Sequence, residues 1–159
     1  MASDYLLEID GIKGESEDKQ HKETIEVMSF SWGAANAGSM AFGGGGGAGK
    51  VSFQDLQFTS SVGKQSPLLA FHCASGKHIA KAVLYVRKAG EDQHDYYIIT
   101  LTDLLVSSYS SAGGGDSIPV DQFSLNFSIV KFEYKIQDSK GAVKPAGEFI
   151  WDLKKNTKG

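Results

Sequence analysis

The sequence predicts an all-β fold: a compact antiparallel β-barrel of two packed sheets with one short flanking α-helix and a long extended loop. Three observations support this prediction. Most of the chain alternates apolar and polar residues with period two, helix start and stop signals occur together in one short stretch, and a glycine-rich run separates two strand-like segments. The chain has 159 residues, of which 41% are hydrophobic and 22% charged, so we expect a single domain over residues 1–159.

Alternation indicates the first two strands. The apolar residues that share one face of the first strand are Tyr5, Leu7 and Ile9. A charged loop over residues 15–22 follows, and we expect His21 in this loop to lie at the surface. In the next segment the apolar face changes near Met28, which predicts either a β-bulge at that position or a strand that is partly buried on both sides.

One short helix is well signalled. Ser66 offers an N-cap hydroxyl, Pro67 suits the first helical position, and Gly76 is typical of a C-terminal cap. Leu69 and Cys73 are four residues apart and would share the face that packs against the sheet. The sequence therefore predicts a helix that is capped by Ser66 and ends at Gly76.

Further strands are expected on both sides of this helix. Apolar and polar residues alternate over residues 51–59, 79–88, 96–106 and 124–136, and in the first of these segments the alternation shifts by one residue. A short closing strand is expected over residues 149–151. The segment 124–136 changes its apolar face between Ile129 and Val130. A long strand that changes its buried side is typical of a curved or barrel-closing sheet.

The run GGGGGAGK over residues 43–50 matches two phosphate-binding patterns, but its context fits neither of them. Val51 stands where a P-loop needs the Ser or Thr that binds magnesium. The residues that follow favour a strand, whereas phosphate is held by the N-terminal amides of a helix. We therefore expect a long loop between two strands, and no nucleotide or other cofactor.

Charge and composition narrow the function classes. The net charge of −3 indicates no surface for nucleic acid or for an anionic membrane. No apolar run approaches the ~20 residues of a membrane helix, and the N-terminus lacks the basic and apolar regions of a signal peptide. We expect a protein that is cytoplasmic when synthesised, does not insert into membranes, and is secreted without a cleaved signal peptide where it leaves the cell.

No familiar catalytic or metal-binding motif occurs in the sequence. The histidines, His21, His72, His78 and His94, lack the paired spacing of a zinc site, and there is no G-x-S-x-G elbow. The sequence therefore predicts a protein that is not an enzyme and holds no metal. Two alternatives stay open: a stand-alone β-barrel that binds a small ligand, and an enzyme whose site carries no recognisable motif.

Short stretches along nearly the whole chain resemble one family in their order and coverage. They comprise Gly11, residues 13–16, His21, residues 29–33, the glycine loop through Lys50, Phe53, Asp55, Leu56, Phe58, residues 75–78, residues 87–90, residues 125–127 and Tyr134. The chain resembles the Hcp (hemolysin-coregulated protein) family, the inner-tube proteins of the bacterial type VI secretion system. The resemblance implies a β-barrel of two sheets, hexameric rings that stack into a tube, effector cargo in the lumen, contacts with sheath and spike proteins, and no catalysis.

Two groups of residues are candidate sites for that role. The ring-stacking candidates are Met40, Phe42, Gly43, Gly44, Gly45, Gly46 and Gly47. The two apolar side chains would anchor in a neighbouring ring, and the glycines would allow close backbone approach; alternatively, the side chains fold back on their own barrel. The candidates for cargo contact in the lumen are Ser29 and Ser31, on the small polar side of one strand. The alternation of polar and apolar residues alone is equally consistent with these two serines lying on a solvated outer wall.

Overall fold

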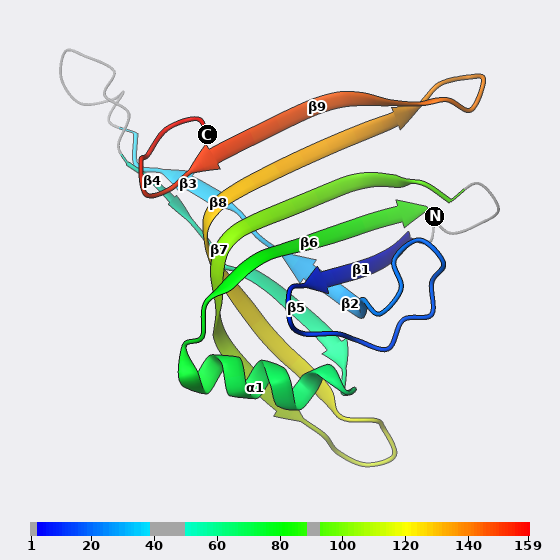
Figure 1. The fold of residues 1–159 in the computed structure, drawn as a ribbon, viewed down its shortest axis with the longest axis vertical. Helices are drawn as coiled ribbons and strands as arrows, with labels where there is room; N and C mark the ends of the chain where they lie inside the picture. Colours follow the sequence, from blue (N-terminus) through cyan, green and yellow to red (C-terminus); the bar gives the residue numbers. More distant parts are fainter. Residues whose placement is uncertain (1–2, 39–49, 89–92) are drawn as a thin grey trace.

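A computed structural model of the chain describes residues 3–38, 50–88 and 93–159 (Figure 1). The described residues contain nine strands and one helix. In chain order they are β1 (Ser3–Ile9), β2 (Ile25–Ser31), β3 (Ala34–Asn36), β4 (Val51–Phe53), β5 (Leu56–Ser61), α1 (Gln65–Ser75), β6 (Ile79–Lys88), β7 (Asp95–Ala112), β8 (Val120–Gln137) and β9 (Val143–Asp152). The candidate stacking residues Met40, Phe42 and glycines 43–47, and with them the middle of the expected long loop, lie outside the described residues.

The main sheet closes on itself. Its strand order is β5-β2-β1-β6-β7-β8-β9, and an additional pairing between β5 and β8 closes the first six of these strands into a barrel (Figure 1). β9 lies beyond the closure and pairs with β8, while β3 and β4 form a separate two-stranded ribbon. Every pairing is antiparallel. The predicted all-β barrel with one flanking helix is confirmed, and the second sheet is small.

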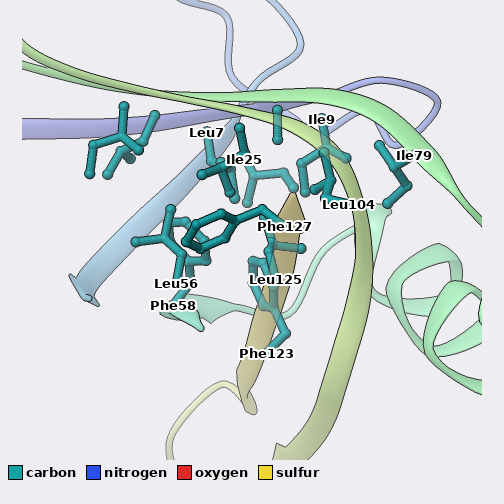
Figure 2. Packing of buried hydrophobic residues seen from close by; sticks show 14 of the residues in the cluster. Leu7, Ile9, Ile25, Leu56, Phe58, Ile79, Leu104, Phe123, Leu125 and Phe127 are labelled. Atoms are coloured by element: carbon teal, nitrogen blue, oxygen red, sulfur yellow. The ribbon is translucent and has the colours of Figure 1, made fainter. Parts of the chain in front are cut away.

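The inward faces of the barrel strands meet in one apolar core (Figure 2). Residues from different strands, among them Leu7, Ile25, Leu56 and Leu125, are almost completely buried. They come from β1, β2, β5 and β8, so the core depends on contacts that are distant in sequence. Burial of this kind is the main favourable contribution to folding, at about 25 cal/mol per Å² of apolar surface.

The predicted bulge occurs in β2. The pairing of β2 with β5 shifts register between Val27 and Ser29, which leaves Met28 as the extra residue. Val27 before the bulge is buried, whereas Ser29 directly after it is exposed. The predicted change of face in β8 is also confirmed, because Phe127 and Val130 are both buried although they are three residues apart.

The segment 51–59, expected as one strand, contains two. β4 pairs with β3, whereas β5 pairs with β2 and β8. The slip of one residue in the alternation therefore marks a change of sheet. At this change the Gln54 N–H donates a hydrogen bond to the carbonyl oxygen of Gly33, with 2.8 Å between the two atoms.

α1 begins differently from the prediction. Its N-cap is Lys64, which makes no side-chain capping bond, and the helix starts at Gln65. The assignment of Ser66 as the cap is wrong, because its hydroxyl accepts from the Gly63 N–H and donates to the buried carboxylate of Asp121. The end of the helix is as expected: Gly76 has φ 65°, a left-handed conformation that glycine adopts readily.

A loop over residues 10–24 folds onto the outer side of β1 and β6. Arg87 on β6 donates hydrogen bonds to both carboxylate oxygens of Asp18 in this loop. The His21 ring stacks on Tyr85 with 3.8 Å between ring centroids, and its Nε2 lies 2.8 Å from a carboxylate oxygen of Asp95. The expectation that His21 lies at the surface is wrong: its side chain is only 11% exposed. These contacts hold the loop against the barrel.

Candidate functional site

The strands β2, β5, β8 and β7 carry small uncharged polar side chains on their outer side, a surface that we term the polar face. It consists of Ser29 and Ser31 on β2, Gln57 and Thr59 on β5, Gln122 and Ser124 on β8, and Ser108 and Ser110 on β7. In the strand register they form two rows across the sheet: Ser29, Thr59, Gln122, Ser110, and Ser31, Gln57, Ser124, Ser108. Together they line an open hollow of about 320 Å³.

Hydroxyl groups bond to one another at one end of the polar face. The Ser124 Oγ lies 2.7 Å from the Ser107 Oγ and 2.5 Å from the Ser108 Oγ. Ser107 also donates to one carboxylate oxygen of Asp55, and the Asn126 amide donates to the other, at 2.6 and 2.9 Å. Asp55 is thus held by two neutral donors, and it places one negative charge at the edge of an otherwise neutral surface.

The same strands are apolar on their inner side. The rings of Phe58 and Phe123, directly opposite each other on β5 and β8, stack with centroids 5.2 Å apart. Phe30 on β2 contacts Tyr5 and Tyr97 at 5.7 and 5.5 Å between centroids. Because side chains alternate along a strand, this aromatic layer fixes the polar side chains on the opposite side.

A buried carboxylate links α1 to this sheet. Asp121 on β8 is fully buried and accepts hydrogen bonds from the Ser66 hydroxyl and from the Tyr109 hydroxyl, the latter at 2.8 Å. Burial, together with the neighbouring Asp121, raises the pKa of Tyr109 above its ordinary value. Since a buried acceptor that loses its donor is costly, this cluster holds the start of α1 against β7 and β8.

Two strand edges next to the polar face have no partner among the described residues. β2 pairs with β1 only at Ile25 and Glu26, so the rest of β2 has β5 on one side and no strand on the other. β7 pairs with β6 only as far as Leu104, so its last eight residues have β8 on one side alone. In Figure 1 this far half of β7 continues past β6 alongside β8. An unpaired edge exposes backbone N–H and C=O groups that can pair with another chain.

These two edges border the sheet β2-β5-β8-β7 on opposite sides, and they run in opposite directions. Each neighbouring pair in this sheet is antiparallel, so β2 and β8 point one way while β5 and β7 point the other way. The β7 edge of one copy can therefore pair with the β2 edge of a second copy in the same antiparallel manner.

The sequence identified part of this surface. Ser29 and Ser31 are both exposed and lie in the two rows of the polar face. The positions on β5, β7 and β8 were missed. Gln57 and Thr59 alternate with buried Leu56 and Phe58, which is the signal that could have found them.

The histidines near Cys73 bond to other groups. The His72 Nδ1 lies 2.8 Å from the Leu68 carbonyl oxygen, and the His78 Nε2 lies 2.9 Å from a carboxylate oxygen of Asp103. Within residues 3–38, 50–88 and 93–159, no group of three or more His, Cys, Asp or Glu side chains is placed to hold a metal ion. The one helix in these ranges is too short and too polar to cross a membrane.

Comparison with known proteins gives consistent matches. A family model described as "Type VI secretion system effector, Hcp" matches residues 6–134. Protein hcp1 of Pseudomonas aeruginosa is 46% identical over 160 residues, which cover 98% of each chain. Among solved structures, Hcp1 from Salmonella typhimurium has a TM-score of 0.82 at 38% identity and full coverage of both chains. A structure described as a type six secretion system protein has a TM-score of 0.92 at 31% identity, covering 99% of this chain and 100% of the other.

Proposed function

Because this chain belongs to the Hcp family of type VI secretion proteins, we propose that six copies assemble head to tail into a ring and that rings stack into a tube. In this role the protein is a structural subunit and performs no catalysis. It needs no cofactor, and its partners are further copies of itself, effector cargo, and the sheath and spike proteins of the secretion machine.

The pair of unpaired edges carries this proposal. A closed ring of identical subunits needs two different, complementary surfaces on each subunit. The β7 edge and the β2 edge meet that requirement, since they border the same sheet on opposite sides and run in opposite directions, as antiparallel pairing between two copies requires. Pairing them would also remove two exposed edges that are otherwise a risk for aggregation.

We infer that the polar face lines the lumen of this ring. Joining the edges extends the sheet β2-β5-β8-β7 from copy to copy, so its outer side becomes one continuous wall that includes Ser29 and Ser31. Hydroxyl and amide groups both donate and accept hydrogen bonds, and they attract proteins of either charge only weakly. Such a wall suits retention and release of different effectors.

The proposal for ring stacking concerns residues outside the described ranges. Met40 and Phe42 would anchor in the neighbouring ring, and Gly43 to Gly47 would let the backbone approach it closely. Replacing both apolar residues by Glu should leave single rings intact and shorten or abolish tubes in electron micrographs. Tubes of normal length would contradict this role for the two residues.

Native mass spectrometry of the purified protein tests the ring directly. A dominant hexamer is the expected result. A monomer would contradict the ring and favour the stand-alone ligand-binding barrel. Amide hydrogen exchange gives a second test: within residues 27–31 and 105–112, the backbone N–H groups that point away from β5 and β8 should be protected in the hexamer and unprotected in the monomer. The outer edge of β9 has no strand partner among the described residues either, so residues 143–151 serve as the internal control and should exchange alike in both states.

A further inference from the structure

α1 leaves an apolar side uncovered. Leu68 is 40% exposed and Phe71 58% exposed, although Leu69 between them is fully buried against the barrel. The helix contains no acidic residue, and the exposed lysines Lys64 and Lys77 stand just before and just after it. Its outward side is therefore apolar in the middle and positively charged towards both ends.

A groove of opposite charge lies where β1 and β2 diverge. It has a volume of about 330 Å³, and its lining includes Asp4, Glu17, Asp18 and Glu26 around the buried Arg87. Asp4 and Asp18 pair with Arg87. Glu17 and Glu26 are exposed and form no ion pair with any residue of the described ranges, so the groove keeps a net negative charge.

An exposed apolar residue stands beside this groove. Met28, the extra residue of the β2 bulge, is 58% exposed. It lines a hollow that adjoins the groove through Glu26 and Val27 and that reaches Gln65 at the start of the same copy's α1. Large apolar side chains that remain exposed on a soluble chain, next to unpaired charges, are typical of a surface that another protein covers.

The helix and the groove adjoin the two unpaired edges. α1 packs on β7, which carries one edge, and the groove borders β2, which carries the other. We propose that in the ring α1 of each copy docks along the groove between β1 and β2 of the next copy. Leu68 and Phe71 then pack near Met28, and the two lysines face Glu17 and Glu26. This inference rests on the proposed ring, and it adds a second contact, outside the lumen wall, to the pairing of the strand edges.

A charge-swap experiment tests this docking. In the helix variant Lys64→Glu and Lys77→Glu are combined, and in the groove variant Glu17→Lys and Glu26→Lys are combined. Each variant alone should assemble at protein concentrations about tenfold or more above those of the wild type, because like charges meet at every interface. An equimolar mixture should restore hexamers by native mass spectrometry, with three copies of each variant, since alternating copies bring opposite charges together at every interface.

Matched controls separate this inference from the ring itself. The variant Lys154→Glu with Lys155→Glu makes the same change of charge as the helix variant, and a change of equal size and opposite sign to that of the groove variant, at exposed positions near the C-terminus; it should assemble like the wild type. The docking is overturned if the helix and groove variants assemble like this control, or if their mixture stays monomeric. In either case a wild-type hexamer would still support the ring. A wild-type monomer would overturn both. All four exchanged residues are exposed, and equal thermal unfolding temperatures of the variants will verify that they fold.

Discussion

The barrel presents two outer surfaces of different character. On β1 and β6, the loop over residues 10–24 covers Tyr85 and its buried strand neighbours Leu6 and Ile98; we term this the latched face. On the polar face most residues, Ser31 and Gln57 among them, are exposed, and no described segment of the chain covers them. A face that keeps apolar residues needs cover from its own chain, whereas a neutral polar face next to unpaired edges is available to other molecules.

The largest loss of stability is expected when the contact between the loop over residues 10–24 and the latched face is removed. Replacing Arg87 by Met removes both hydrogen bonds to Asp18 and leaves that carboxylate, 14% exposed, without its partner. We expect the free energy of unfolding to fall by about 2–3 kcal/mol in chemical denaturation. The control Lys81→Met removes an exposed cation from the same strand and should change stability by less than about 0.5 kcal/mol. Equal effects of the two variants would show that the contact between Arg87 and Asp18 contributes little to stability.

A smaller loss of stability is expected from a substitution in the buried layer behind the polar face. In Asp121→Asn, one oxygen that accepts a hydrogen bond becomes an amide donor, so Ser66 or Tyr109 loses its acceptor. The free energy of unfolding should fall by about 1–2 kcal/mol. The matched control is Asp116→Asn in the exposed turn between β7 and β8. A stability equal to that of the control would mean that the buried carboxylate does not hold α1.

Acid should weaken the latched face selectively. The hydrogen bond from Arg87 is the main reason why the pKa of Asp18 lies below its ordinary 3.8. A carboxyl with a lower pKa in the folded state contributes stability above pH 3.8 that is lost as the pH falls through the folded value. The stability of the wild type should therefore fall more steeply than that of Asp18→Asn between about pH 5 and pH 2. Parallel pH profiles of the two proteins would contradict this.

The smallest effect on stability is expected on the polar face. Ser31→Trp places a bulky group on an exposed position and should change the free energy of unfolding by less than about 1 kcal/mol. Its effect should appear in function, as altered retention of effectors by assembled rings in a pull-down assay. Ser139→Trp, in the exposed turn before β9, is the control. Retention that does not respond to Ser31→Trp would contradict the assignment of this face to the lumen.

Local patterns were sufficient for the barrel class, for the bulge at Met28 and for the end of α1 at Gly76. They failed where a partner distant in sequence decides the outcome. Ser66 has the chemistry of a cap, but Asp121, 55 residues away, takes its hydroxyl. His21 lies in a charged loop, but its contacts with Tyr85 and Asp95 hold it against the barrel.

The polar face was predicted least well for a related reason. β7 extends to Ala112, six residues beyond its predicted end, because Ser107 to Ser111 show no apolar alternation from which a strand could be recognised. Its membership in the sheet depends on pairing with β8, which sequence periodicity does not show. Only Ser29 and Ser31, which alternate with large apolar residues, could be placed on an outward side beforehand.

β7 belongs to both regions, and β8 pairs with it along nearly its whole length. Each has 18 residues and is long enough to span about 60 Å when straight. One half of β7 pairs with β6 in the latched face, and the other half borders the polar face. The two halves meet at an irregular stretch, because the pairing of β7 with β8 shifts register between Val106 and Ser108 and Asp103 has φ 52°. A mechanical push or pull on either region therefore reaches the other along covalent backbone, but it passes through this bulge. Strain within one molecule should therefore concentrate at this bulge before it reaches the regular parts of either strand.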